Sequence, residues 1–518
     1  MIPVLTAEEA RALEREAEAR GTSVEVLMER AGHAVARAAA ELAGGSYGRR
    51  AVVVAGKGNN AGDGFVAARF LASWGMRATV VLVGEADELR EPAAANFERL
   101  AGTGVRVVPF SEEAADRELE RADVAIDAIF GLGFHGTPKD PYAAAMNSFE
   151  MHEVPVVSVD IPSGVESDTG RCHGSAIHPT VTVTFGAPKI GNILPPGACP
   201  YGSKLEVADI GYPRELVTRV EPYLPYQWPI TLLEIGDVTT PSPKPPNAHK
   251  RDAVVLVVAG SRRMTGAPAL VASGAYRAGA GLVILAVPGS ILPVVQSAVR
   301  EATFLPLPED SSGVVSERAW DVLSEILSTV HAVAVGPGLS REGGAPAFVR
   351  RLVRESPVPL VIDADAINAF AGSAADLAER NAEAVITPHH GELARLMGIS
   401  THEVRDDLLG SVRAASRETS MPVLLKGWPN LLAVPEGNVK IERTGTSALA
   451  TAGTGDVLTG VISGFLAHAG GADDGAIAGA QVHGLAGRVA VERIGPGITA
   501  GDVAESIPEA IRRLREDA

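Results

Sequence analysis

The sequence contains few cysteines, few aromatic residues and no long apolar run. Its 518 residues include two cysteines, Cys172 and Cys199, which cannot build a disulfide framework or a cysteine-based zinc site. Such cysteine usage is typical of a reducing compartment, so we expect a cytoplasmic protein. The N-terminus lacks the basic and apolar regions of a signal peptide, and no apolar run reaches the ~18 residues of a membrane span. We therefore expect neither secretion nor a membrane partner.

Positive charge is also scarce. Lysine and arginine number 46 against 63 aspartates and glutamates, which gives a formal net charge of −17. This balance argues against a nucleic-acid partner with a large footprint, although a local pocket can still be basic. Hydrophobic residues make up 46% of the chain, aromatic residues 4%, and there are 56 glycines. Small aliphatic side chains with many glycines are typical of parallel α/β layers.

Short runs rich in valine and isoleucine recur along both halves of the chain, with alanine-rich stretches between them. Continuous apolar runs predict strands that are covered on both faces, and hence mostly parallel sheets. In the N-terminal half the runs occupy residues 49–58, 77–85, 123–131, 154–164 and 180–189. In the C-terminal half they occupy residues 253–260, 281–289, 331–339, 359–368, 382–392 and 421–427. The fold class is therefore α/β, with a doubly wound sheet in the first half and a three-layer sandwich in the second.

The sequence also indicates where two helices begin and where one domain ends and the next begins. Thr6 with Glu9, and Thr22 with Glu25, have the spacing of a capping box. Between residues 219 and 250 there are seven prolines, which forbid a continuous helix and stiffen the chain. We predict a first domain at 1–218, a linker at 219–227 and a second domain at 228–518. The rest of the proline-rich segment should wrap onto the second domain.

The stretch ATAGTGDVLTGVISGF, residues 450–465, places Asp456 behind a Gly-Thr-Gly turn and before an apolar helical run. Gly453 and Gly455 let the backbone turn tightly, and their amides with that of Thr454 would form a nest for a phosphoryl group. We predict that Asp456 occupies the first helical position and accepts a proton from an attacking hydroxyl. The alternative is an aspartate that only complements the helix dipole.

Other residues are expected at the same sheet edge. Lys426 ends a predicted strand and can reach a nucleotide phosphate, and the Gly-containing turns at 336–339 and 265–268 face the same way. The segment TPHHGE supplies His389 and Glu392. Because no H-x-x-x-H spacing or cysteine partner accompanies the histidines, hydrogen bonding to a polar ligand is favoured over zinc.

The motifs GAPAL, GPGL, DADAIN, TPHHGEL, LLKG and ATAGTGDVLTG, in this order, resemble those of the ADP/ATP-dependent NAD(P)H-hydrate dehydratases. The resemblance spans 228–518 and implies a ribokinase-like three-layer α/β/α domain. This chain has Ala452 where the family usually carries glycine, which puts only nucleotide affinity in doubt. The resemblance implies substrate contacts at Ala267, Gly338, His389 and Asp456. It implies nucleotide contacts at Lys426, Gly427, Trp428, Pro429, Asn430, Gly453, Thr454 and Gly455.

A second glycine-rich loop lies in the N-terminal half, in GKGNNAGDGFVAARFLASWG at 56–75. Its carboxamides and carboxylate offer oxygens to a cation and donors to a ligand. Asp127 opens another glycine loop at 127–137, and Asp160, Ser163 and Lys189 follow later strands. Turn formation without chemistry is the alternative for any one of these motifs, but not for all four together.

These motifs, with LMERAG at 27–32, resemble the NAD(P)H-hydrate epimerases over about 1–218, which implies a Rossmann-like domain. The resemblance implies a potassium ion held by Asn60, Asp127 and Ser163, and Asp160 is our candidate acid or base. Family members often have glycine at position 61, where this chain has alanine. Substrate contacts are implied at Asn59, Asn60, Ala61, Gly62, Asp63, Gly131, Leu132, Gly133, Phe134, His135, Gly136, Thr137, Tyr142, Asp160 and Lys189. Lys189 is also expected to tune Asp160.

Together the two resemblances imply a bifunctional repair enzyme. It would exchange the R and S epimers of hydrated NADH and NADPH and dehydrate the S form at the expense of ADP, releasing AMP and phosphate. Magnesium is expected with the nucleotide, potassium in the epimerase domain, and a homo-oligomer as the assembly. The alternative is a ribokinase-like small-molecule kinase fused to a domain that senses nucleotides or binds proteins without catalysis.

Overall fold

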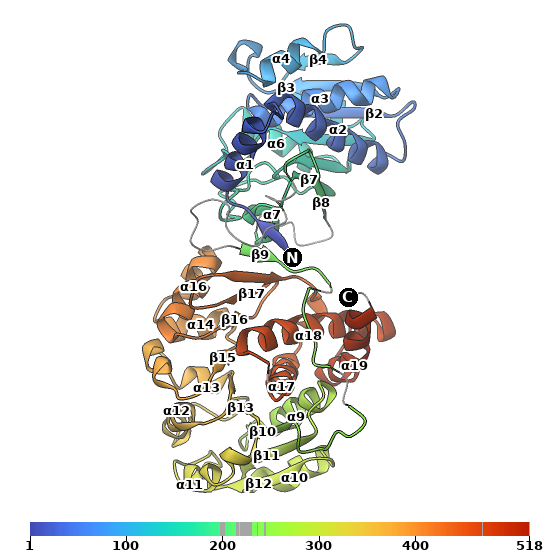
Figure 1. Ribbon diagram of the computed structural model, residues 1–518. Helices are drawn as coiled ribbons and strands as arrows, with labels where there is room; N and C mark the ends of the chain where they lie inside the picture. The colour runs from blue at the N-terminus through green and yellow to red at the C-terminus, as the bar shows by residue number, and fades with distance from the viewer. Residues whose placement is uncertain are drawn as a thin grey trace. The chain divides into compact units, whose positions relative to one another are not determined.

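The computed structural model describes residues 1–196, 203–213, 217, 230–235, 237–242, 245–468 and 470–516. The chain divides into two compact units, an N-terminal unit of Ile2–Tyr226 and a C-terminal unit of Gln227–Ala518 together with Met1 (Figure 1). The predicted linker at 219–227 and Cys199 lie outside the described residues. Among the described residues, no helix is both long and apolar enough to cross a bilayer.

The N-terminal unit is built on a parallel sheet in the order β4-β3-β2-β5-β6-β7-β8. All five predicted strands of this half are confirmed. The strands of this sheet are β2 (Arg50–Ala55), β3 (Arg77–Leu82), β4 (Arg106–Pro109), β5 (Val124–Ala128), β6 (Val156–Val159), β7 (Val181–Phe185) and β8 (Lys204–Ala208), and the short strand β1 (Ile2–Val4) lies outside it. Its helices are α1 (Ala7–Ala19), α2 (Val24–Leu42), α3 (Asn59–Ser73), α4 (Ala93–Glu98), α5 (Glu112–Leu119), α6 (Tyr142–Glu150) and α7 (Ile190–Ile193).

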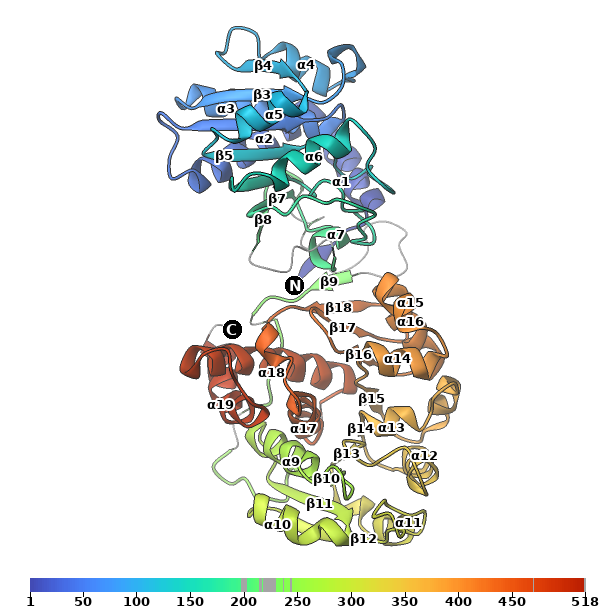
Figure 2. The same cartoon turned by 180° about the vertical axis from the view of Figure 1, so that it is seen from behind.

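The helices cover both faces of this sheet, which is the doubly wound arrangement that the apolar runs predict. Val53 packs with the buried faces of α2 and α3. The adjacent Val52 points to the opposite face and packs with α5 and α6. Figures 1 and 2 show α2 and α3 on one side of the strands and α5 and α6 on the other. Alternate side chains of one strand thus enter two separate cores.

The two predicted helix starts differ in outcome. Thr6 forms the expected capping box, in which its hydroxyl accepts from the Glu9 amide and the Glu9 carboxylate accepts from the Thr6 amide. The start predicted at Thr22 is wrong by one residue, because Ser23 is the N-cap of α2 and accepts from Val26. Both serine and threonine can cap, and the local spacing does not distinguish them.

The C-terminal unit has a mixed sheet whose strands run in the order β9-β18-β17-β16-β15-β14-β13-β10-β11-β12. The six strands predicted from apolar runs are confirmed, and β15, β14, β13, β10 and β11 pair in parallel. The strands are β9 (Ile230–Leu232), β10 (Val254–Val258), β11 (Leu282–Pro288), β12 (Thr303–Leu307), β13 (Ala332–Val335), β14 (Leu360–Ile362), β15 (Ala384–Ile386), β16 (Val423–Leu425), β17 (Asn430–Ala433) and β18 (Val439–Glu442). The helices are α9 (Ala267–Arg277), α10 (Leu292–Ala298), α11 (Ala319–Ser324), α12 (Ala345–Glu355), α13 (Asp365–Asn368), α14 (His390–Met397), α15 (Thr401–Asp406), α16 (Leu408–Thr419), α17 (Thr454–Leu466), α18 (Ala472–Ile494) and α19 (Ala500–Glu516).

Helices lie on both faces of the second sheet, as expected for a three-layer sandwich. Figure 2 shows α9, α17, α18 and α19 on one side of the strands and α12, α13 and α14 on the other. Helix α17 approaches α9 through glycine: a Cβ atom on Gly460 would lie 2.1 Å from the carbonyl oxygen of Val271. The described part of the proline-rich segment joins this unit as predicted, since β9 pairs with β18 and the Glu234 carbonyl accepts from Gln481.

Candidate active sites

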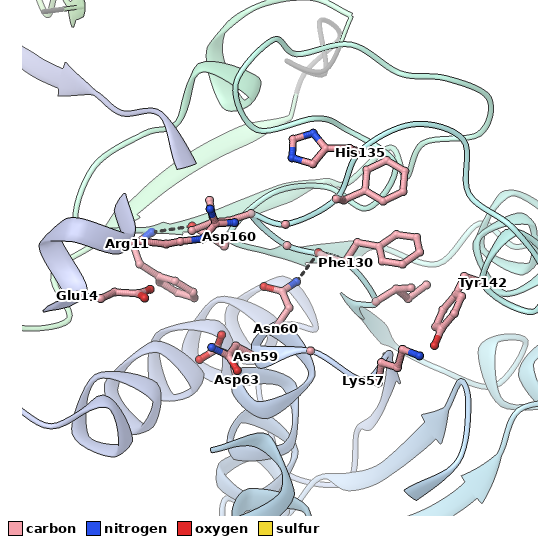
Figure 3. A pocket seen from close by; sticks show the side chains of 17 residues that line it. Arg11, Glu14, Lys57, Asn59, Asn60, Asp63, Phe130, His135, Tyr142 and Asp160 are labelled. Atoms are coloured by element: carbon pink, nitrogen blue, oxygen red, sulfur yellow. Dashed lines mark hydrogen bonds between the residues drawn. The ribbon is translucent and has the colours of Figure 1, made fainter. Parts of the chain in front are cut away.

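The carboxyl ends of β2, β5 and β6 meet at one edge of the N-terminal sheet, where open α/β sheets bind ligands. A cavity of about 520 Å³ opens there (Figure 3). Its lining combines the loop after β2, the loop after β5 and Asp160 at the end of β6. It is lined by Arg11, Glu14, Lys57, Gly58, Asn59, Asn60, Asp63, Ile129, Phe130, Gly131, Leu132, Gly133, Phe134, His135, Tyr142, Asp160 and Phe185.

Asp160 is 5% exposed and has a φ angle of 61°, a left-handed conformation that is uncommon for residues other than glycine. Its Oδ1 atom accepts from Lys189 Nζ at 2.6 Å, from Thr184 Oγ1 at 2.9 Å and from the Phe185 amide at 3.3 Å. Its Oδ2 atom has no hydrogen-bond partner among the described residues. The strained backbone therefore fixes a carboxylate with one oxygen committed and the other available.

Three carboxyl groups come together at this cavity. Burial and the charge of Asp160 raise the pKa of Asp63 well above its usual range, and the same two causes raise the pKa of Glu14. The buried Lys189 ammonium, 2% exposed, pairs with Asp160. Figure 3 shows Glu14 on α1, Asp63 on α3 and Asp160 on the strand side of the pocket. Neighbouring carboxyls with different environments can serve as acid and base.

The predicted cation ligands form one buried network beside the cavity. Both oxygens of Asp127 accept hydrogen bonds, from Ser158 Oγ at 2.8 Å, from the Ser163 amide at 2.9 Å and from Ser163 Oγ. Asn60 Nδ2 lies 2.6 Å from the carbonyl oxygen of Phe130 and 3.0 Å from that of Val159. Burial raises the pKa of Asp127 despite these donors. Oxygen atoms from three strand ends therefore converge here.

The structure separates the predicted substrate contacts into two groups. Asn59, Asn60, Asp63, Gly131, Leu132, Gly133, Phe134, His135, Tyr142 and Asp160 line the cavity. Ala61, Gly62, Gly136, Thr137 and Lys189 do not: Gly62 packs on Met28, and the Gly136 amide donates to Glu166. Sequence reasoning missed Arg11 and Glu14, because their helix reads as an ordinary charged amphipathic segment.

In the C-terminal unit, neighbouring strands deliver the predicted residues to one edge of the sheet. Ala267, Gly338, His389 and Lys426 follow β10, β13, β15 and β16 in that order. Gly338 has a φ angle of 68°, and a Cβ atom on it would lie 3.3 Å from that of Ala267. The Lys426 amide donates to the carbonyl of Pro388 at 2.8 Å, which places it beside His389.

The Gly-Thr-Gly turn leads into α17, with Gly453 as the N-cap at a φ angle of 88°. Asp456 is the third helical residue, so the prediction that it occupies the first position is wrong by two. The Thr454 hydroxyl donates to the carbonyl groups of Leu449 and Thr451 and locks the turn. Ala452 is exposed and is not among the positive-φ residues, so its methyl group fits the backbone here.

Asp456 is half-buried, and its carboxylate accepts no hydrogen bond from the described residues. Burial and the nearby charge of Asp363 raise its pKa to about 7, against a lowering effect of Lys426. An aspartate that only stabilised the helix terminus would be expected to have a lowered pKa. The environment of Asp456 is instead that of a base poised near neutral pH.

Lys426 is held in place by acidic neighbours. Burial alone would lower its pKa, but Asp363 and Glu392 outweigh that effect, so the pKa is raised. Its Nζ atom lies 2.6 Å from Asp363 Oδ1 and 4.0 Å from Glu392 Oε2. Asp363 belongs to the DADAIN motif, but no local pattern indicates its contact with Lys426.

His389 caps α14. Its Nδ1 atom accepts from the Gly391 amide at 2.9 Å, while its Nε2 atom lies 3.4 Å from Glu392 Oε1. Burial and the charge of Lys426 lower the pKa of His389, so it stays neutral at pH 7 with Nε2 carrying the proton.

In the predicted nucleotide loop, the Arg443 guanidinium lies 4.9 Å from the centre of the Trp428 ring, and Asn430 donates to Glu442.

No cluster of three or more histidine, cysteine, aspartate or glutamate side chains suited to a metal ion occurs in the described part of the chain. Of the two cysteines, Cys172 is free and half-buried. Burial raises the pKa of its thiol to about 11, so it is protonated at neutral pH.

Both units match established families. The family described as NAD(P)H-hydrate dehydratase matches residues 255–509, and the one described as YjeF-related protein N-terminus matches residues 24–191. Among curated proteins, the bifunctional NAD(P)H-hydrate repair enzyme Nnr of Thermofilum pendens is 38% identical over 517 residues, 98% of this chain and 96% of the relative. The enzyme of the same name from Moorella thermoacetica is 39% identical over 500 residues, 95% of this chain and 93% of the relative.

Solved structures resemble single units. An ADP/ATP-dependent NAD(P)H-hydrate dehydratase from Bacillus subtilis, crystallised with ATP and Mg²⁺, is 24% identical with a TM-score of 0.47, covering 54% of this chain and 96% of its own. A yeast protein is 28% identical with a TM-score of 0.34, covering 36% of this chain and 82% of its own.

Proposed function

The chain belongs to the family of bifunctional NAD(P)H-hydrate repair enzymes, and from that premise we propose how its residues divide two reactions between the two units. The enzyme acts on hydrated NADH and NADPH, in which water has added to the nicotinamide ring. It epimerises the R and S forms and dehydrates the S form. We assign epimerisation to residues 1–218, dehydration to residues 228–518 and the connecting segment to 219–227.

Dehydration must convert a poor leaving group into a good one, because hydroxide is not expelled at neutral pH. Asp456 accepts the proton of the C6 hydroxyl, and the hydroxyl oxygen then attacks the terminal phosphorus of the nucleotide. The bond from this phosphorus to the rest of the nucleotide breaks as the new P–O bond forms. Phosphate then departs with the C6 oxygen, the C5 proton passes to water, and the ring double bond returns. The observation that carries this proposal is the half-buried Asp456, with its pKa of about 7, in the first turn of α17 directly after the Gly453 N-cap. The 453–455 amides and Lys426 stabilise the charge on the phosphoryl group.

We propose ADP as the phosphoryl donor, giving AMP and phosphate. Asp363 has both oxygens occupied by hydrogen bonds, so it is not free to bind a divalent cation. The residues fit magnesium that is held mainly by nucleotide phosphates and water, with Asp456 and Glu392 as the neighbouring carboxylates. Ala267, Gly338 and His389 would contact the hydrated cofactor. We also propose a homo-oligomeric enzyme that works in the cytoplasm.

Epimerisation needs the C6–O bond to break and to form again on the other face of the ring. A proton delivered to the hydroxyl lets water leave while the ring nitrogen forms a C=N bond. Water then adds to the opposite face and returns a proton. Asp160, whose Oδ1 atom accepts a hydrogen bond from Lys189, is the candidate base, and Asp63 on α3, whose pKa is raised by burial, is the candidate acid. Their contrasting environments support this assignment.

Potassium fits the buried oxygen network beside this cavity. Asn60, Asp127 and Ser163 would hold the ion together with backbone carbonyl oxygens, a donor set that suits a large monovalent cation. Bound there, potassium would supply a positive charge that anchors the loop after β5. The same residues offer no cluster of acidic side chains for a divalent ion.

We therefore expect epimerase activity to be higher in potassium than in sodium or lithium salts. Ser163→Ala removes one oxygen ligand and should raise the potassium concentration for half-maximal epimerase activity about 10–100-fold. Titrations of activity with potassium chloride, at ionic strength held constant by a large organic cation, would measure this. The control Ser148→Ala alters a buried serine on α6 that donates to Ala144. Equal activity in all salts would contradict the potassium assignment.

The proposed reactions can be followed by the absorbance of the reduced cofactor at 340 nm. Full-length enzyme, given hydrated NADH and ADP, should restore the absorbance and release one phosphate for each NADH. A small-molecule kinase would instead leave a stable phosphate ester, and its absorbance trace would stay flat. ATP in place of ADP separates the two donors, and recovery with ATP alone would overturn the choice of ADP.

A further inference from the structure

Asp363 follows β14 and is 1% exposed, yet it makes contacts that tie the proposed dehydratase residues together. Its Oδ1 atom accepts from Lys426 Nζ at 2.6 Å and from Thr387 Oγ1 at 2.8 Å. Its Oδ2 atom accepts from Thr459 Oγ1 at 2.7 Å. A buried carboxylate is retained only where such donors compensate its lost hydration.

These bonds reach three elements of the site. Lys426 follows β16, Thr387 follows β15, and Thr459 lies on α17, where its hydroxyl also contacts the carbonyl of Gly455 at 3.1 Å. The Lys426 ammonium sits close to the turn, since a Cβ atom on Gly455 would lie 3.7 Å from its Nζ atom. Asp363 therefore connects the lysine to the helical turn that carries Asp456.

We propose that Asp363 is a positioning residue for phosphoryl transfer, which holds Lys426 against the amide nest and sets the electrostatic environment of Asp456. The proposal rests on the proposed dehydratase function. Asp363 does not itself take the substrate proton, because both of its oxygens already accept hydrogen bonds. The hydroxyl proton passes to Asp456, and the phosphoryl charge is met by Lys426 and the backbone amides.

The charges around Asp456 make this role testable. After burial, Asp363 is the strongest influence that raises the pKa of Asp456, and Lys426 acts in the opposite direction. Of the other groups near this network, Glu392 on α14 has a pKa raised by burial, with Lys426 acting in the opposite direction, and His389 has a pKa lowered by burial. Burial lowers the pKa of His483 on α18 to about 4, so it is neutral. Removing the Asp363 charge should therefore lower the pKa of Asp456.

The test is the Asp363→Asn variant of the full-length enzyme. We expect the dehydration rate to fall about 10–100-fold and the KM for ADP to rise, because the carboxamide holds Lys426 poorly. The acid limb of the kcat/KM profile should also move to lower pH, since Asp456 loses a negative neighbour. A fall in rate with no movement of the acid limb would mean a structural role alone and would overturn the proposal.

Asp363→Glu is the matched variant, because it displaces Lys426 but keeps the charge. It should lose rate, but its acid limb should not move to lower pH, because Asp456 keeps its negative neighbour. If Asp363→Asn does not fold, Thr459→Val tests the same network by deleting one hydrogen bond. It should raise the KM for ADP with the acid limb unmoved, and an unchanged KM would count against the proposal. Failure of the dehydratase assignment is recognised separately, because the wild-type enzyme would then restore no absorbance at 340 nm with either ADP or ATP.

Discussion

Replacing Asp456 with asparagine is expected to reduce ADP-dependent recovery of NADH by about 10²–10⁴-fold, the contribution of a general base, while epimer exchange continues. Asparagine keeps the shape of the side chain but cannot accept the hydroxyl proton. Recovery is measured at 340 nm, and epimer exchange is measured by chromatographic separation of the two forms. Because the epimerase residues lie in the other unit, exchange also reports that the N-terminal unit is folded.

The pH dependence of dehydration by the wild-type enzyme is a second test of Asp456. Below its pKa of about 7, Asp456 is protonated and cannot act as a base, so dehydration should decline as the pH falls through 7. In Asp456→Asn the residual rate should lack this limb. A residual rate that is near wild type, or that keeps the limb, would show that another group is the base.

A matched control addresses the simpler role of an acid at a helix terminus. Glu403 is the third residue of α15, as Asp456 is of α17, but its carboxylate accepts from the Ser400 amide and its pKa is lowered. Glu403→Gln should lose helix stability and keep dehydration. If both substitutions had the same small effect on activity, Asp456 would be no more than a helix-terminal charge.

Replacing Asp160 with asparagine is expected to slow epimer exchange by about 10²–10⁴-fold and to leave dehydration of the S form intact. With a mixture of R and S hydrate, recovery of NADH should then stop once the S form is consumed. The remaining R form would react only at the rate of its spontaneous epimerisation. A biphasic absorbance trace is the measurement, and its second phase reports the epimerase step alone.

The substitution of Asp160 by asparagine is not expected to strain the backbone. Asp160 has a positive φ angle of 61°, and asparagine tolerates this conformation as well as aspartate does. A loss of exchange would therefore reflect the carboxylate rather than backbone strain. Asp123→Asn is the control, since Asp123 precedes β5 at the opposite sheet edge and pairs with Arg49. If the Asp160→Asn enzyme restored all of the NADH in a single phase, Asp160 would not be the acid or base of epimerisation.

The apolar runs were sufficient to predict the two parallel cores. A strand buried on both faces leaves an uninterrupted series of small aliphatic residues, as in Ala51–Ala55, and that signal is local. The strands that the sequence missed have weaker patterns. β17 and β18 form an antiparallel pair at the side of the second sheet, and β12 is only partly buried. For β12, partial burial leaves a mixed composition, which does not distinguish a strand from a loop.

The sequence by itself determined the two sheets, the glycine turns at their edges and the chemistry-bearing residues that stand in those turns, because strand periodicity and turn geometry are encoded over a few neighbouring positions. Only the tertiary structure decided which distant groups meet. It set Glu14 at the same cavity as Asp160, and it placed Asp363 beside Lys426. Ionisation depends on burial and on charges from other strands and helices, and no local pattern carries that information.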